Sequence, residues 1–147
     1  MRALLDSPTA YGSTYDREIV FVEVDWQNRL DRHDAATFVG VQDDETVVGL
    51  ATGAIDDDIS EIAWLLSMWV DPIARGNDVA SLLIAEVIAW SELQNCTTLR
   101  LQVTDGNTSA ERAYSKRGFQ RTGVTEIRDR DQMLEFEMEL ALRTKGN

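Results

Sequence analysis

The feature that most constrains this chain is an uncharged apolar run that leads through a short turn into an apolar helix. Residues 62–70 read Ile-Ala-Trp-Leu-Leu-Ser-Met-Trp-Val, which is typical of a strand buried on both faces. Asp71-Pro72 ends this strand, because proline cannot donate a hydrogen bond to a neighbouring strand. Apolar residues then recur at helical spacing, at Val79, Leu82, Leu83, Val87 and Trp90. A buried strand must therefore lie beside the N-terminus of a helix.

The turn between this strand and helix has the composition of an anion-binding site. It reads Arg75-Gly76-Asn77-Asp78-Val79-Ala80. The free N–H groups of the first helical turn and the positive end of the helix dipole face whatever binds there. Arg75 can offer a charged fork to a phosphate, and Gly76 lets the backbone come close. By itself, the turn is also compatible with an ordinary connection that carries a surface arginine.

A second segment, residues 107–119, follows a strand predicted at residues 98–104. It reads as a short helix in which Thr108 and Glu111 have the spacing of a capping box. Basic residues and a glycine suit its C-terminal end: Lys116, Arg117 and Gly118. This pattern explains the helix and leaves Asn107 and Tyr114 free for another role.

Together, the two segments resemble the GCN5-related N-acetyltransferase (GNAT) family. The first is similar to its acetyl-CoA pyrophosphate motif, R/Q-x-x-G-x-G/A. The second is similar to a later motif, N-x-x-A-x-x-x-Y-x-K-x-G-F, matched here by Asn107, Ala110, Tyr114, Lys116, Gly118 and Phe119. The resemblance covers residues 35 to the C-terminus and extends weakly to residues 3–13.

The resemblance implies one N-acetyltransferase-like domain over residues 1–147 with an α/β (α+β) fold. Its mixed, mostly antiparallel sheet is flanked by helices and splayed at the two central strands. Residue patterns predict helical segments at 1–6 and 15–32, a loop at 7–13, and strands at 37–42, 46–55, 61–70, 98–104, 119–127 and 132–142. The first edge strand of the family's sheet is either upstream of Met1 or absent. The strand near Phe38 would then be an edge, and pairing through it makes a homodimer a hypothesis.

The same resemblance implies a direct transfer of an acetyl group from acetyl-CoA to an amine. The pantetheine arm would lie between the splayed strands and pair with the backbone of Met68, Trp69 and Val70, while the pyrophosphate binds the turn from Arg75 to Ala80. A backbone N–H near Val70 would stabilise the thioester oxygen, and Asn107 would bind the cofactor arm.

Two side chains are candidates for the proton transfers of that reaction. Tyr114 would protonate the departing thiolate, since a phenol with a pKa of about 10 is reasonably matched to a thiol near 8.5. The alternative for Tyr114 is an aromatic residue that fills a gap between helix and sheet. Glu61 would deprotonate the amine through water, or it is an exposed glutamate at a strand end.

Asp78 departs from the family motif, because it stands where the first glycine is expected. A carboxylate about 6 Å from a pyrophosphate would cost about 2–3 kcal/mol at an effective dielectric of about 20. That cost corresponds to an affinity up to about a hundredfold weaker. In a benign alternative, Asp78 caps the helix and turns toward solvent or pairs with Arg75. A non-catalytic binding or dimerisation module with weakened coenzyme A affinity is therefore the alternative function.

Net charge, apolar run length and residue counts limit the partners, the location and the metal binding that we expect for this protein. The net charge of −12 argues against nucleic acid as a partner and is compatible with a cationic amine acceptor. No apolar run has the length of a membrane span, and a basic-then-apolar leader pattern is missing, so we expect a cytoplasmic protein. The single cysteine, Cys96, is expected to be structural, and His33 to face solvent. Asp56-Asp57-Asp58 reads as a solvated turn, so no metal is expected. The patterns do not identify the acceptor amine.

Overall fold

The computed structural model of this protein describes residues 1–6 and 23–145. In chain order its elements are α1 (Arg2–Asp6), α3 (Glu23–Leu30), β1 (Ala35–Val41), β2 (Val47–Ile55), β3 (Ile62–Val70), a 3-10 turn η1 (Pro72–Ala74), α4 (Val79–Leu93), β4 (Thr98–Thr104), α5 (Thr108–Lys116), β5 (Gln120–Ile127) and β6 (Leu134–Ala141). All six predicted strands are confirmed, with ends that differ from the prediction by at most two residues. Of the helical segment predicted at 15–32, only α3 falls within the described residues; the loop predicted at 7–13 lies outside them.

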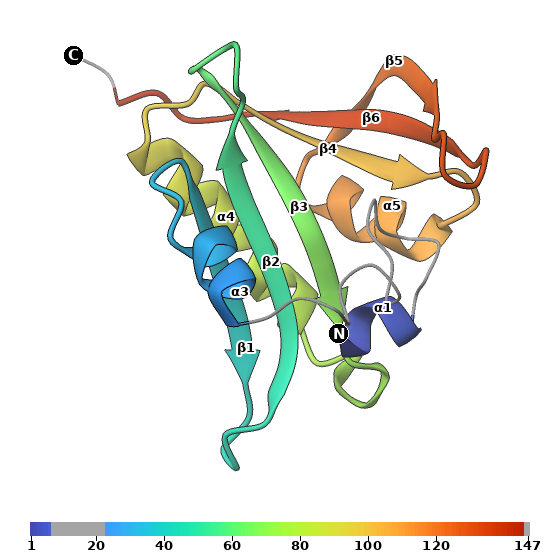
Figure 1. The fold of residues 1–147 in the computed structure, drawn as a ribbon. Helices are drawn as coiled ribbons and strands as arrows, with labels where there is room; N and C mark the ends of the chain where they lie inside the picture. Colours follow the sequence, from blue (N-terminus) through green and yellow to red (C-terminus); the bar gives the residue numbers. More distant parts are fainter. Residues whose placement is uncertain (7–22, 146–147) are drawn as a thin grey trace.

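The six described strands form one mixed sheet whose central pair joins only at one end. Their order is β1-β2-β3-β4-β6-β5, and every neighbouring pair is antiparallel except β3 and β4, which are parallel. The β3–β4 ladder contains three residue pairs, from Ile62↔Thr98 to Trp64↔Arg100. Beyond this point the two strands diverge toward the end of the sheet where α1 and α5 lie (Figure 1). The predicted splay of the central strands is confirmed.

Strand β1 is the edge of the sheet among the described strands, as predicted for the segment around Phe38. Val39 and Val41 on this strand are each 54% exposed. The unpaired backbone of such an edge can accept another strand. Pairing of two copies through β1 remains a prediction.

Helix α4 packs closely on the sheet because β2 presents very small residues to it. A Cβ added at Gly49 would lie 3.0 Å from the Leu83 side chain, and one at Gly53 would lie 2.6 Å from the Trp90 ring. Ile84 and Val87 are fully buried at this contact. Because α4 begins at the candidate anion-binding turn, this packing fixes where that turn lies.

The buried face of α4 differs from the stripe that helical spacing predicted. Leu82 is 63% exposed, whereas Leu83, Ile84, Val87 and Ser91 are buried. The helix is apolar on nearly every side, so spacing by itself does not identify the inner face. The position of the small residues on β2 decides it.

The β4–β6 pair has one buried face and one polar face. Phe136 and Met138 of β6 are buried together with Val103 and Leu101, their partners on β4. The glutamates between them are only partly buried: Glu135, Glu137 and Glu139. The two-residue alternation predicted for this strand is confirmed, because side chains alternate between the faces of a sheet.

Helix α5 does not begin with the predicted capping box. Its N-cap is Asn107, whose side-chain oxygen accepts a hydrogen bond of 3.3 Å from the Ala110 amide. Glu111 instead forms a bidentate ion pair with Arg121 of β5, at 2.7 and 2.8 Å. The prediction was wrong because asparagine, one residue earlier, is a stronger N-cap than threonine.

The structure also shows the surroundings of Cys96, His33 and Trp64. Cys96 is 1% exposed, and burial raises the pKa of its thiol, as expected for a structural residue. His33 faces solvent as predicted. Trp64 is half-buried and donates to Asp56, at 2.7 Å. In the described part of the chain, every helix is too short or too polar to cross a bilayer.

Replacement of Gly53 by alanine should lower the free energy of unfolding by about 1–3 kcal/mol, because the new methyl group would overlap the Trp90 ring. Chemical denaturation followed by tryptophan fluorescence and circular dichroism measures this change. In a Trp90→Leu background the same replacement should cost less, because the smaller side chain leaves room. Equal costs in both backgrounds would show that the contact does not set the distance between α4 and the sheet.

Candidate functional site

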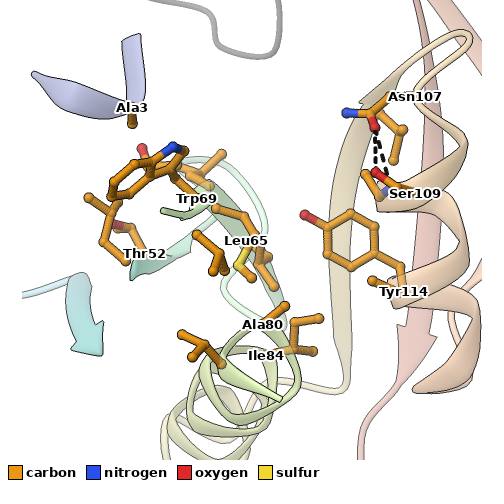
Figure 2. A pocket seen from close by; sticks show the side chains of 18 of the residues that line it. Ala3, Thr52, Leu65, Trp69, Ala80, Ile84, Asn107, Ser109 and Tyr114 are labelled. Carbon is orange, nitrogen blue, oxygen red and sulfur yellow. Dashed lines mark hydrogen bonds between the residues drawn. The ribbon is translucent and has the colours of Figure 1, made fainter. Parts of the chain in front are cut away.

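A cavity of about 1100 Å³ lies between the diverging strands β3 and β4. Its walls come from α1, β3, the start of α4, the end of β4 and helix α5 (Figure 2). The following predicted site residues line it: Met68, Trp69, Val70, Arg75, Gly76, Asp78, Val79, Ala80, Asn107 and Tyr114. The two predicted motifs, far apart in the sequence, therefore meet in one cavity. Asn77 and Glu61 are not among its lining residues.

The β3 wall is shaped by a bulge. The register between β2 and β3 shifts between Leu50 and Thr52, opposite Ser67, which has a φ of 55°. A residue in this left-handed region turns the strand and re-aims the side chains that follow it. Leu66, just before the bulge, is 44% exposed, so the prediction of a strand buried on both faces fails at the cavity.

The N-terminus of α4 opens onto the cavity without a side-chain cap. Asp78 occupies the N-cap position with φ 61° and ψ 9°, and its carboxylate makes no capping hydrogen bond. The first amides of a helix have no intrahelical acceptor, so those of Val79, Ala80 and Ser81 are available to an anion. At Gly76 an added Cβ would meet no atom within 4 Å, so the turn leaves space on this side.

Asp78 is exposed and does not pair with Arg75, so of the two benign alternatives only the solvent-facing one holds. Arg75 Nε donates to the carbonyl of Val70 at 3.0 Å, and Nη2 forms an ion pair with Asp6 at 2.5 Å. Trp69 Nε1 donates to the same Asp6 oxygen at 3.1 Å. Asp6 therefore ties α1 to both the end of β3 and the arginine of the turn.

The left-handed backbone explains why the family motif has glycine where this chain has Asp78. Aspartate adopts positive φ more readily than most residues but still less easily than glycine. The substitution thus keeps the turn at a cost in strain and adds a negative charge at the cavity wall.

Helix α5 supplies the opposite wall, and Figure 2 shows Tyr114 on it with the hydroxyl pointing into the cavity. The Tyr114 ring contacts Phe119 edge-to-face, with centroids 5.7 Å apart. The Asn107 side-chain oxygen is engaged at the helix cap, which leaves its amide nitrogen for another acceptor. The packing alternative for Tyr114 is thus only part of its role in this geometry: the ring packs, while the hydroxyl faces the cavity.

Burial raises the pKa of Tyr114 well above its usual value of about 10. The group therefore stays a neutral phenol throughout the neutral pH range and can donate a hydrogen bond into the cavity. Tyr114 is therefore also a weaker acid than the sequence suggested.

The two walls of the cavity are joined by Arg117 at the end of α5. Its guanidinium donates to the Ser81 hydroxyl and to the Ser81 carbonyl in the first turn of α4. Sequence reasoning assigned Arg117 only to the helix C-terminus. Because Arg117 and Ser81 lie 36 residues apart in the chain, no local sequence pattern points to their contact.

Sequence reasoning also missed Glu135, which lines the cavity, and Asp6, which binds the arginine of the turn. Glu61, the predicted base, lies in the exposed turn before β3. Its carbonyl accepts from the Thr97 amide at 2.7 Å, at the closed end of the β3–β4 pair. The geometry thus does not bring Glu61 together with Tyr114 and gives no support to its assignment as base.

Comparison with known proteins agrees with this arrangement of strands and motifs. The model of the acetyltransferase (GNAT) family matches residues 2–119. The chain belongs to this family. A sequence search of curated proteins finds no match.

Solved structures of GNAT proteins have the same fold. A GCN5-related N-acetyltransferase from Kribbella flavida aligns with a TM-score of 0.74 at 22% identity, over 96% of this chain and 87% of its own. NAA60 from Arabidopsis thaliana, in complex with a bisubstrate analogue, has a TM-score of 0.73 at 18% identity, over 98% and 92%. The ribosomal-protein-S18-alanine N-acetyltransferase from Escherichia coli has 0.71 at 17%, over 96% and 86%.

Asp78→Gly should tighten acetyl-CoA binding by up to about a hundredfold, because it removes a carboxylate beside the amides of α4. It should also raise thermal stability, since glycine adopts φ 61° without strain. Calorimetry and thermal melting measure the two effects.

Asp78→Asn is the matched control, because asparagine also tolerates the left-handed region but carries no charge. It should reproduce most of the gain in affinity and little of the gain in stability. Unchanged affinity in both variants would show that Asp78 is remote from the phosphates.

Proposed function

We propose that this GNAT protein is an acetyl-CoA-dependent N-acetyltransferase that transfers an acetyl group directly to a primary amine of a small molecule or a peptide. The observation that carries the proposal is the Tyr114 hydroxyl, which points into a cavity whose opposite side is formed by the uncapped N-terminus of α4. An anion-binding helix end and a protonated phenol are the groups that a CoA thioester needs at its two ends.

The cavity residues suit the phosphate end of such a cofactor. The amides of Val79, Ala80 and Ser81 would bind the pyrophosphate, and Gly76 leaves the approach open. Arg75 is held beside them by Val70 and Asp6, and Lys116 on the facing helix lines the same cavity. Asn77, which follows Gly76 outside the cavity lining, would act only through the shape of the turn.

The β3 strand suits the pantetheine arm. The ladder to β4 stops at Trp64, so the backbone of Met68, Trp69 and Val70 faces the cavity in place of a neighbouring strand. The arm would add to this edge as a strand does, with Asn107 donating its amide from the other side. An amide N–H near Val70 would then stabilise the charge that builds on the thioester oxygen.

Tyr114 would protonate the sulfur as it departs. The hydroxyl is neutral, so it carries the proton that the thiolate would take, and burial makes it a weaker acid than a free phenol. A positioned acid of this kind contributes a factor of about 10²–10⁴ to the rate.

Thermal melting with acetyl-CoA and a thiol-release assay test the proposal together. A ligand of the native state must raise its stability, so millimolar acetyl-CoA should raise the melting temperature. Thiol release should then depend on added amine, with spermidine, a lysine-containing peptide and a peptide with N-terminal alanine as acceptors. Binding without release for every acceptor would favour the non-catalytic module, and the absence of both would reject coenzyme binding altogether.

Tyr114→Phe should lower kcat by about 10²-fold or more and leave the affinity for acetyl-CoA within about twofold, because only the hydroxyl is lost. Steady-state kinetics and calorimetry measure the two quantities. Phe119→Leu is the matched control, since it alters the ring contact of Tyr114 but keeps the hydroxyl. Wild-type turnover in Tyr114→Phe would remove this residue from the chemistry.

A further inference from the structure

Two carboxylates line the cavity among the residues that the structure describes, Asp78 and Glu135. Asp78 stands at the start of α4, beside the amides assigned to the phosphates. Glu135 lies near the start of β6, opposite Thr104 at the end of β4. It is therefore the carboxylate of the lining that does not stand beside the phosphate-binding amides.

The register of the sheet places Glu135 on the opposite face from Tyr114. Glu135 pairs with Thr104, the last residue of β4, and directly opposed residues of two strands point to the same face. Val103 and Phe136, one residue away on each strand, point the other way into the core that contains Tyr114. The cavity between β3 and β4 is lined by both Tyr114 and Glu135, so it reaches from one face of the sheet to the other.

Arg128 fixes the orientation of Glu135. Its Nη1 donates to Glu135 at 3.0 Å, while Nε and Nη2 hold the two oxygens of Asp131 at 2.9 and 2.7 Å. The Arg128 side chain is only 9% exposed and that of Glu135 15%. A nearly buried ion pair is weak evidence for stability, and here it holds one oxygen of Glu135 against Arg128. The second oxygen of Glu135 has no hydrogen-bond partner within the described part of the chain.

Further carboxylates lie beside Glu135 on the two strands β5 and β6. From β5 the residue directly opposite is Glu126, which accepts from Gln102 of β4 at 3.4 Å. Glu137, two residues along β6, lies 3.8 Å from Arg100. Glu126 thus adds a second carboxylate beside Glu135, which favours a cationic acceptor, whereas Glu137 is paired with Arg100.

We propose that Glu135, positioned by Arg128, binds the acceptor amine as an ammonium ion and accepts its proton, directly or through one water. This inference rests on the proposed acetyltransferase function and names the base that the function requires. It places the acid and the base on opposite faces of the sheet, so that the cofactor and the acceptor reach the reacting carbon from opposite sides.

The proton balance follows from this placement. The ammonium ion loses one proton to Glu135, and the freed lone pair forms the C–N bond while the C–S bond breaks. The sulfur takes a proton from Tyr114, and the second proton of the attacking nitrogen returns through solvent to Tyr114. Glu135 then releases its proton to bulk water. One ammonium ion and one thioester give one amide, one thiol and one proton.

The test is Glu135→Gln, assayed as kcat and KM over pH 6–10 with whichever of spermidine, the lysine peptide and the alanine peptide the wild type acetylates. We expect kcat at neutral pH to fall by about 10²-fold or more, with KM for acetyl-CoA unchanged. The defect should shrink as pH rises through the pKa of the amine, because more acceptor is then already neutral. A purely structural role would not produce this recovery.

Glu137→Gln is the matched control, since it removes a carboxylate on the same strand and face that does not line the cavity. It should keep kcat within about twofold. Glu135→Asp, which keeps the carboxylate at a shorter reach, should lose less than Glu135→Gln, and thermal melting checks that all three variants fold.

The outcomes separate this inference from the proposed function. If Glu135→Gln keeps wild-type turnover and an unchanged pH profile, the role of Glu135 is overturned and the proposed function stands. A wild type that releases no thiol with any of the three amines overturns the proposed function, and the role of Glu135 with it.

Discussion

The site depends on the three-pair ladder between β3 and β4, the shortest contact in an otherwise continuous sheet. Two parallel strands that separate after Trp64 must leave backbone polar groups without a sheet partner, and such groups are costly to bury unless something binds them. The bulge at Ser67 and the packing of α4 on Gly49 and Gly53 hold the strands in this divergent arrangement. The cavity is therefore a consequence of the sheet geometry and does not depend on any one side chain that lines it.

Charge at the start of α4 is balanced differently from what the family motif suggests. The helix N-terminus attracts an anion, yet its N-cap is an aspartate in a left-handed conformation and its arginine is held by Asp6. Asp6 belongs to α1, so the same ion pair that orients Arg75 also fixes α1 against Trp69. An anion at this turn meets an arginine that is already engaged with Val70 and Asp6, which limits how far the guanidinium can move toward it.

Alternation along β4 and β6 gives the cavity two chemically different sides. On the face covered by α4 and α5, these strands contribute apolar residues to the core that also holds Tyr114, whose pKa burial raises. The other face carries the glutamates of β6, of which Glu135 lines the cavity, and the nearly buried arginine that pairs with it. Because each strand must alternate, a change of one residue in register would exchange these two sides.

The sequence by itself determined the six strands, the helix after Arg75 and the two motifs that meet at the cavity, because period-two and helical spacing and turn residues act over a few positions. It misassigned the cap of α5 and the inner face of α4, it did not identify Asp6 as the partner of Arg75, and it pointed to Glu61 for a base. Those features depend on contacts between distant segments: Asp6 with Arg75, Ser81 with Arg117, and β6 with the end of β4. Local patterns specify which face a strand buries, but only the assembled sheet decides which side chains of different strands surround one space.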